Sequence, residues 1–220
     1  MDYLVFRLYG PMASWGEIAV GESRHSAPYP GKSALLGLLG AALGIRREEE
    51  DRQRALADGY RFAVKLISDG SLLRDYHTVQ APDSAGKRAY RTRRDELIQG
   101  RGRLGTILSG REYRCDSQAL VAVSALASAP CSLKELRKAL IRPRFQLSLG
   151  RKSCVLAAPL APTIVPAGGF RGALDNYAVQ PLLDEGSYWD GDERWLPRSG
   201  GRYFWEGERE DFARAGDDFN

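Results

Sequence analysis

The sequence predicts an α+β chain with a ferredoxin-like (RRM-like) core, because strand and helix patterns follow one another in the order β-α-β-β-α-β. About 45 residues separate the second strand from the third, far more than a hairpin loop holds. Prolines and short apolar runs replace regular patterns after residue 150. We therefore expect a ferredoxin-like domain over residues 1–150, a basic thumb-like insertion at about 74–115, and a small β-rich C-terminal region over 151–220.

The first strand is predicted at residues 3–9, "YLVFRLY", where apolar side chains alternate. One face carries Leu4, Phe6 and Leu8. The other carries Tyr3, Val5, Arg7 and Tyr9, and this face is aromatic and basic, which a plain solvent face would not need. The alternation thus predicts a strand with two specialised faces.

An apolar helix follows, with Ser33 as a candidate N-cap and Gly44 as a helix stop. A polar helix, "EEEDRQRALA", and a strand at 60–67 come next. The remaining core elements are an apolar strand at 117–127 and a helix over 133–140.

Ser132 and Glu135 form an S-x-x-E capping box at the start of the second core helix. A short strand is expected after it, within "RPRFQLSLG" and ending at Gly150. This strand would be the fourth of the core.

Charge is distributed unevenly along the chain. The stretch from Arg74 to Arg114 holds ten Lys and Arg residues against five acidic ones, whereas Asp184 to Asn220 holds eleven acidic residues against five Arg. Such asymmetry indicates that the middle of the chain contacts a polyanion. The acidic end is expected to face water or a protein partner.

Several classes of protein are excluded by composition. No run approaches the roughly 20 apolar residues of a membrane span, and the N-terminus lacks a signal-peptide pattern, so we expect a cytoplasmic chain without membrane contact. Cys115, Cys131 and Cys154 are odd in number and lack C-x-x-C spacing. We therefore expect buried free thiols, no disulfide framework, no metal site and no cofactor.

The segment "PGKS" at 30–33 invites comparison with a phosphate-binding loop. Ser26 stands where the motif requires glycine, and Pro28 and Pro30 remove backbone N–H groups. Nucleotide hydrolysis is therefore not expected. The helix N-terminus near Lys32 could still receive one phosphate of a longer polymer.

His25 and His77 are the two histidines of the chain. His77 adjoins Tyr76 and could act as a general base on an RNA 2′-hydroxyl. No spacing ties it to a second catalytic group, so a structural or RNA-stacking role is favoured, and His25 is interpreted in the same way. We assign no catalytic residue.

The strongest composition signal is "KRAYRTRRDELIQGRGR" at 87–103, with seven basic side chains, a stacking candidate and two glycines. A second basic segment at 142–154 holds four cations and no acid. Stacking needs unpaired bases, so we expect single-stranded RNA, for which ferredoxin-like sheets offer a platform. The expected RNA-binding residues are Arg24, Lys32, His77, Lys87, Arg88, Tyr90, Arg91, Arg93, Arg94, Arg101, Arg103, Arg111, Arg144, Gly150, Arg151 and Lys152.

Five motifs together resemble a known family. They are "GPMASWG" (10–16), "PGKSALLGLLGAALGI" (30–45), "LRDYHTV" (73–79), "REYRCD" (111–116) and "LGRKSC" (149–154). This set is similar to the CasD family of Cascade, the type I-E CRISPR surveillance complex. The similarity covers most of the first 155 residues and is weaker beyond them.

The resemblance implies a non-catalytic, ferredoxin-like RAMP protein that caps the 5′ handle of CRISPR RNA (crRNA) for antiviral defence. It also implies that the thumb packs on an adjacent CasC-type backbone subunit, that a large CasA-type subunit docks nearby, and that target DNA is contacted indirectly. In a related subtype the corresponding subunit is a metal-independent endoribonuclease that processes repeat RNA. That alternative stays open.

Overall fold

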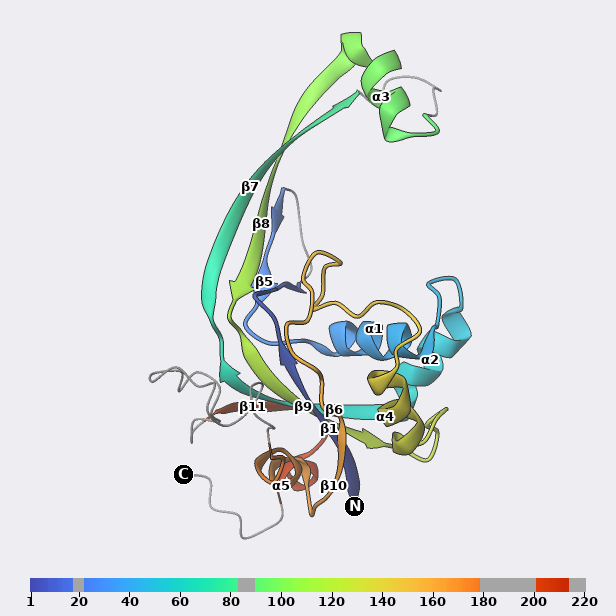
Figure 1. Cartoon of the computed structure of the whole chain (residues 1–220), viewed down its shortest axis with the longest axis vertical. Coiled ribbons are helices and arrows are strands. Elements are labelled where there is room, and N and C mark those ends of the chain that lie inside the picture. The colour runs from blue at the N-terminus through green and yellow to red at the C-terminus, as the bar shows by residue number, and fades with distance from the viewer. Residues whose placement is uncertain (18–21, 83–89, 179–200, 214–220) are drawn as a thin grey trace.

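The chain has a mixed α+β fold in the computed structural model, which describes residues 1–17, 22–82, 90–178 and 201–213. At its centre lies a five-stranded sheet in the order β10-β1-β9-β6-β11 (Figure 1). Each neighbouring pair in this sheet is antiparallel. The strands are β1 (Asp2–Tyr9), β6 (Tyr60–Ser68), β9 (Gln118–Ala125), β10 (Thr163–Pro166) and β11 (Arg202–Trp205).

Three helices cover one face of this sheet: α1 (Lys32–Leu43), α2 (Glu50–Gly59) and α4 (Leu133–Ile141). Their apolar side chains pack against Leu4, Phe6 and Leu8, the face of β1 that the alternation predicts. The main core of the protein therefore lies between these helices and the sheet.

The helix ends follow the sequence signals with one exception. Gly44, at φ 75°, ends α1 as expected, and Ser132 and Glu135 form the expected capping box of α4. The expected N-cap at Ser33 is wrong, because α1 begins one residue before it and Gly31 occupies the N-cap position. Gly31 has no side chain, so this helix start has no side-chain cap.

The second face of the sheet is also covered. Tyr3 and Val5 belong to a core cluster with α5 (Phe170–Asp175) and α6 (Arg209–Phe212). The ring of Tyr3 lies 5.0 Å from that of Phe170, and the Nε of Arg7 donates a hydrogen bond to the Pro159 carbonyl. The aromatic and basic face of β1 is thus a second core, and the expectation of an open platform for RNA bases on this sheet is wrong here.

Counted along the chain, the fourth strand of the sheet is β10. The expectation that the fourth strand ends at Gly150 is therefore wrong. The backbone of that segment makes hydrogen bonds elsewhere. Arg144 and Phe145 donate to the carbonyls at the C-terminal end of α1, and Leu149 accepts from the N–H of Ser14. Its peptide groups are therefore not available to a sheet edge.

A long antiparallel hairpin, β7 (Ser71–Pro82) paired with β8 (Leu104–Cys115), projects from the body between β6 and β9 (Figure 1). Its far end carries α3 (Arg93–Gln99) and the 3₁₀ turn η1 (Arg101–Arg103). Near the body, β8 also pairs with β2 (Met12–Ala13) and β4 (Ser23–Arg24). Close by, β3 (Trp15–Gly16) pairs with β5 (Ser26–Ala27).

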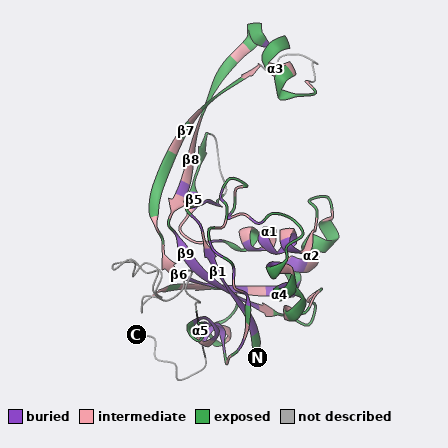
Figure 2. Ribbon diagram, in the orientation of Figure 1, coloured by how far each residue is buried: buried purple, intermediate pink, exposed green. Residues whose placement is uncertain are grey.

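Most of the hairpin is exposed, in contrast to the central sheet (Figure 2). It nevertheless carries large apolar side chains. The exposed ones are Leu72, Leu73, Tyr76, Val79, Leu97, Ile98, Ile107 and Leu108. The hairpin is therefore stabilised mainly by its own strand pairing, and its apolar surface is open to a partner.

The thiols of Cys115, Cys131 and Cys154 are free. Cys154 is buried as expected, whereas the other two are only half-buried. Across the described segments, no helix combines the length and the apolar character needed to cross a bilayer.

Candidate RNA interface at the base of the hairpin

A pocket of about 360 Å³ lies where β7 and β8 meet β4, at the base of the hairpin. We call it the base pocket. Its lining includes three arginines, a histidine, a tyrosine and a carboxylate that is central to its structure: Arg24, Arg74, Arg111, His25, Tyr76 and Glu112. Three separate parts of the sequence therefore supply its walls.

Strand register brings these residues together. On the paired strands Arg74 lies opposite Glu112 and Tyr76 lies opposite Gly110. On the other edge of β8, the parallel strand β4 places Arg24 beside Arg111. The position opposite Tyr76 is a glycine, so no side chain covers the ring from across the ladder, and 68% of Tyr76 is exposed.

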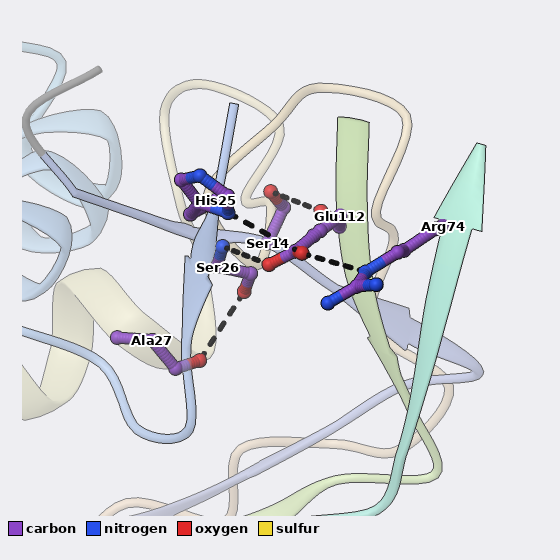
Figure 3. A network of polar contacts seen from close by, with 6 residues as sticks. All are labelled: Ser14, His25, Ser26, Ala27, Arg74 and Glu112. Carbon is purple, nitrogen blue, oxygen red and sulfur yellow. Dashed lines mark hydrogen bonds and ion pairs between the residues drawn. The ribbon is translucent and has the colours of Figure 1, made fainter. Parts of the chain in front are cut away.

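Glu112 is the centre of a polar network that joins three elements (Figure 3). Its Oε1 lies 3.0 Å from Nε of Arg74 and 3.3 Å from Nδ1 of His25, and its Oε2 accepts a hydrogen bond from the N–H of Ser26. Burial alone would raise the pKa of Glu112, but the hydrogen bonds from Ser26, His25 and Arg74 lower this pKa below its ordinary value. The carboxylate is therefore held in its charged form.

Two serines fix the loop that carries His25. The Oγ of Ser26 accepts from the N–H of Trp15 and donates to the Ala27 carbonyl, at 3.0 and 3.2 Å. The Oγ of Ser14 donates to the backbone carbonyl of Glu112. The wall of the base pocket is thus tied to both β8 and the β3–β5 pair.

The arrangement suits a phosphate chain with unpaired bases. Guanidinium groups bind phosphate through paired donors, and an exposed tyrosine ring gives a base a surface to stack on. The other carboxylate of the lining, Asp75, lies 2.5 Å from Nε2 of His77. Both carboxylates of the lining therefore already face a cationic or imidazole group of the chain.

Among the residues expected to bind RNA, Arg24 and Arg111 line the base pocket. The expected loop "LGRKSC" packs on the same end of the hairpin, because the guanidinium of Arg151 lies 4.8 Å from the centre of the Tyr113 ring. Lys152 of this loop is exposed.

The structure requires glycine at position 150 for a reason other than the expected contact with RNA. Its φ is 87°, and a Cβ there would lie 1.8 Å from the carbonyl oxygen of Ser14. The close backbone approach is therefore to the chain itself, and contact with RNA at this residue stays a prediction.

Other expected residues lie elsewhere. Lys32 is paired with Glu206 at 3.3 Å, and the side chain of Arg144 packs against Gly44 at the C-terminal end of α1. Lys87 and Arg88 fall outside the described residues. The far end of the hairpin holds Tyr90, Arg91, Arg93, Arg94, Arg101 and Arg103.

The far end of the hairpin is separate from the base pocket. From Arg74 to Gln80 the strand advances about 20 Å, and Gln80 accepts a hydrogen bond from Arg93 of α3. The expectation that all the basic segments share one groove is thus wrong for the residues at the far end of the hairpin. Within the hairpin, the described basic residues form one cluster at the base and another at the tip.

The expected RNA-binding residues do not include Arg74, Tyr76 or Glu112, and the sequence favours a structural or stacking role for His25. A signal for two of them exists, since Arg74 and Tyr76 are two residues apart in "LRDYHTV" and share a strand face. Among the described residues, no group of three His, Cys, Asp or Glu side chains could hold a metal ion.

Comparison with known proteins gives a consistent picture. Residues 3–213 match the family model described as CRISPR-associated protein (Cas_Cas5). The CRISPR system Cascade subunit CasD of Escherichia coli (strain K12) is 38% identical over 184 residues, covering 80% of this chain and 77% of that protein.

Two solved structures are also similar. A chain titled "CRISPR RNA-guided surveillance complex" has a TM-score of 0.54 and 31% identity; the match covers 72% of this chain and 61% of that one. A chain titled "Crystal structure of Cas protein" has a TM-score of 0.47 and 29% identity, covering 82% of this chain and 67% of that one. From its sequence and its family match, this chain belongs to the CRISPR-associated Cas5 family.

Proposed function

We propose that this chain is a non-catalytic, cytoplasmic subunit of a Cascade-type CRISPR surveillance complex, and that it holds the 5′ handle of crRNA at the base pocket. The observation that carries the proposal is the lining of the base pocket, which combines Arg24, Arg74 and Arg111 with the exposed ring of Tyr76. Three cations and one stacking surface provide what a single-stranded RNA end requires. The similarity to CasD supports the same role in antiviral defence.

We further propose that the core is ferredoxin-like and that the hairpin is its thumb. The strand order β10-β1-β9-β6 supports this, because a ferredoxin-like sheet places its fourth strand beside the first and its third between the first and second. The domain then extends through β10 to residue 166 instead of ending at residue 150. The hairpin at 71–115 is inserted between the second and third strands of this core.

We infer that the exposed side of the hairpin contacts other proteins of the complex. Ile98 and Ile107 are 60% and 51% exposed, and they lie on α3 and β8. Several large apolar side chains exposed on one projecting element are characteristic of protein interfaces. A CasC-type backbone subunit on the hairpin, a CasA-type subunit nearby and indirect contact with target DNA complete the proposed partners.

The alternative function, cleavage of repeat RNA, is less well supported. It relies on Tyr76 and His77 acting together, but these are adjacent on β7 and point to opposite faces of the strand. His77 also faces Asp75 at 2.5 Å. His25 shares the base pocket with Tyr76, so both histidines need testing.

The test is to incubate the purified full-length chain with repeat RNA in EDTA, and to measure both retention and cleavage. We expect intact RNA, bound more tightly when it carries the 5′ handle than when it carries a scrambled sequence of equal length. The double variant Arg24→Ala with Arg111→Ala should bind at least tenfold more weakly.

The matched control is Arg52→Ala with Arg54→Ala, which removes two arginines from α2, outside the hairpin. This control should bind like the wild type. A discrete RNA product lost in His77→Ala or His25→Ala would establish the nuclease alternative. Equal binding of handle and scrambled RNA would refute a handle-specific subunit.

A further inference from the structure

We propose that Glu112 is a positioning residue for RNA binding: it turns Arg74 and His25 so that their outer nitrogens face the phosphates of the bound strand. The inference rests on the proposed function and deepens it. It assigns to the base pocket a phosphate subsite that is assembled by a carboxylate, although a carboxylate by itself repels phosphate.

The geometry of Arg74 is the first step. Its Nε lies 3.0 Å from Oε1 of Glu112, and 77% of its side chain is exposed. A guanidinium has a fixed planar fork of five N–H donors, so using Nε leaves the Nη1 and Nη2 edge facing outward. That edge matches the paired oxygens of a phosphate.

His25 completes the subsite from the opposite wall. Its Nδ1 lies 3.3 Å from the same Oε1, and 58% of its side chain is exposed. With Nδ1–H donating to Glu112, Nε2 is directed away from the carboxylate, and in the imidazolium form it donates to a phosphate oxygen. A single carboxylate oxygen thereby contacts the imidazole on one side and the guanidinium on the other (Figure 3).

Glu112 itself is kept away from the ligand. Its side chain is 12% exposed, and its second oxygen accepts from the N–H of Ser26. The remaining charges of the lining are Arg24, Arg111 and Asp75. Ionic partners cover the carboxylate, so it orients the donors with little direct repulsion of the RNA.

The test uses the full-length chain and a fluorescein-labelled single-stranded RNA with the sequence of the crRNA 5′ end. Glu112→Gln removes one negative charge from a site for a polyanion. If Glu112 is only a nearby charge, affinity should rise. If it positions two donors, affinity should fall, and we expect a loss of roughly tenfold.

A second comparison removes the expected loss of RNA affinity on Glu112→Gln. In a chain already lacking both donors, Arg74→Ala with His25→Ala, Glu112 has nothing left to orient. Adding Glu112→Gln to that background should leave affinity unchanged or increase it, whereas a further tenfold loss would contradict the proposal. Glu49→Gln is the matched control: Glu49 accepts from Arg52 and from the N–H of Arg46, outside the base pocket, and should not alter binding.

Arg74→Lys separates charge from orientation and does not depend on the folding of the Glu112 variant. It keeps the positive charge but loses the outward-facing fork, so we expect it to bind as weakly as Arg74→Ala. Wild-type affinity in Arg74→Lys would overturn the proposal. Inorganic phosphate should compete with the RNA at millimolar concentration in the wild type and more weakly in Glu112→Gln, and equal competition would contradict the subsite.

The outcomes distinguish a failure of this inference from a failure of the proposed function on which it rests. A wild-type chain that shows no preference for the crRNA 5′ end refutes the proposed function. A wild-type chain that binds it tightly, together with a Glu112→Gln variant that is folded by thermal unfolding and binds at least as well, refutes the positioning role alone.

Discussion

The ammonium nitrogen of Lys65 on β6 lies 2.6 Å from Oδ1 of Asp175 on α5, and only 8% of Lys65 is exposed. The hydroxyl of Tyr203 donates to the same oxygen at 2.6 Å. Burial tends to lower the pKa of Lys65, but the contacts with Asp175 and Tyr203 raise it overall. This contact ties α5 to the second face of the sheet, so that face is closed and the RNA must bind elsewhere.

Replacing Asp175 with alanine should destabilise the fold by leaving Lys65 buried without its partner. Breaking a buried ion pair costs about 3 to 5 kcal/mol. Because 37% of the Asp175 side chain is exposed and water screens the pair, we expect the free energy of unfolding to fall by about 2 kcal/mol. Urea unfolding measures this change.

Asp69→Ala is the matched control for that variant. Asp69 pairs with Arg202 of β11 at 2.9 Å, but both side chains are more than half exposed. Its loss should change stability by less than about 0.5 kcal/mol. Equal effects of the two substitutions would show that the Lys65 contact does not hold α5 in place.

Gly150→Ala should destabilise the chain because no side chain fits there. The residue has φ 87°, and the added Cβ would lie 1.8 Å from the Ser14 carbonyl oxygen. Strain in this backbone region and a forced shift of the loop together should cost about 2 to 3 kcal/mol. Gly102→Ala, where no atom lies within 4 Å of the added Cβ, should be neutral in the same thermal unfolding experiment. Similar melting temperatures for the two variants would contradict the close approach.

Acid should weaken the contribution of Glu112 to stability. Its pKa is lowered from 4.5 in the folded chain, so the stabilisation is complete above pH 4.5 and is lost as pH falls through the lower folded-state value. The stability difference between wild type and Glu112→Gln should therefore shrink as the pH falls below 4.5. Urea unfolding at each pH gives the two curves. A difference that did not shrink below pH 4.5 would show that Glu112 is not held as a carboxylate.

The apolar tip of the hairpin should matter for assembly and not for folding. Ile98→Asp places a charge on a side chain that is 60% exposed in the chain alone, and an interface would bury it. We expect at least a tenfold loss in co-purification with the neighbouring subunits and an unchanged melting temperature. Ile141→Asp, 52% exposed on α4, is the control of similar exposure. Normal assembly of Ile98→Asp would show that the tip of the hairpin is not part of the interface.

The core elements were predictable because their residues face a core with a regular period. Leu4, Phe6 and Leu8 alternate as a half-buried strand requires, and the Ser132–Glu135 capping box marks a helix start locally. The fourth strand was missed because β10 has only four residues and is recognised by its pairing with β1, which periodicity within the segment does not reveal.

The base pocket could be predicted only in part. Both faces of the hairpin are largely exposed, so no hydrophobic period reveals its two strands or their register. Without the register, Arg74 and Glu112, separated by 38 residues, cannot be recognised as neighbours. Charge composition identified the basic stretch, but it could not separate the base of the hairpin from its tip.

Photo-crosslinking within the assembled complex tests the central claim most directly. The crRNA would carry 4-thiouridine at successive positions of its 5′ end, and mass spectrometry would locate the attached residues. We expect crosslinks to the three segments that line the base pocket, above all to Tyr76, and their loss in the Arg24→Ala, Arg111→Ala chain. Crosslinks confined to the helical face of α1, α2 and α4 would contradict an RNA end held at the base of the hairpin.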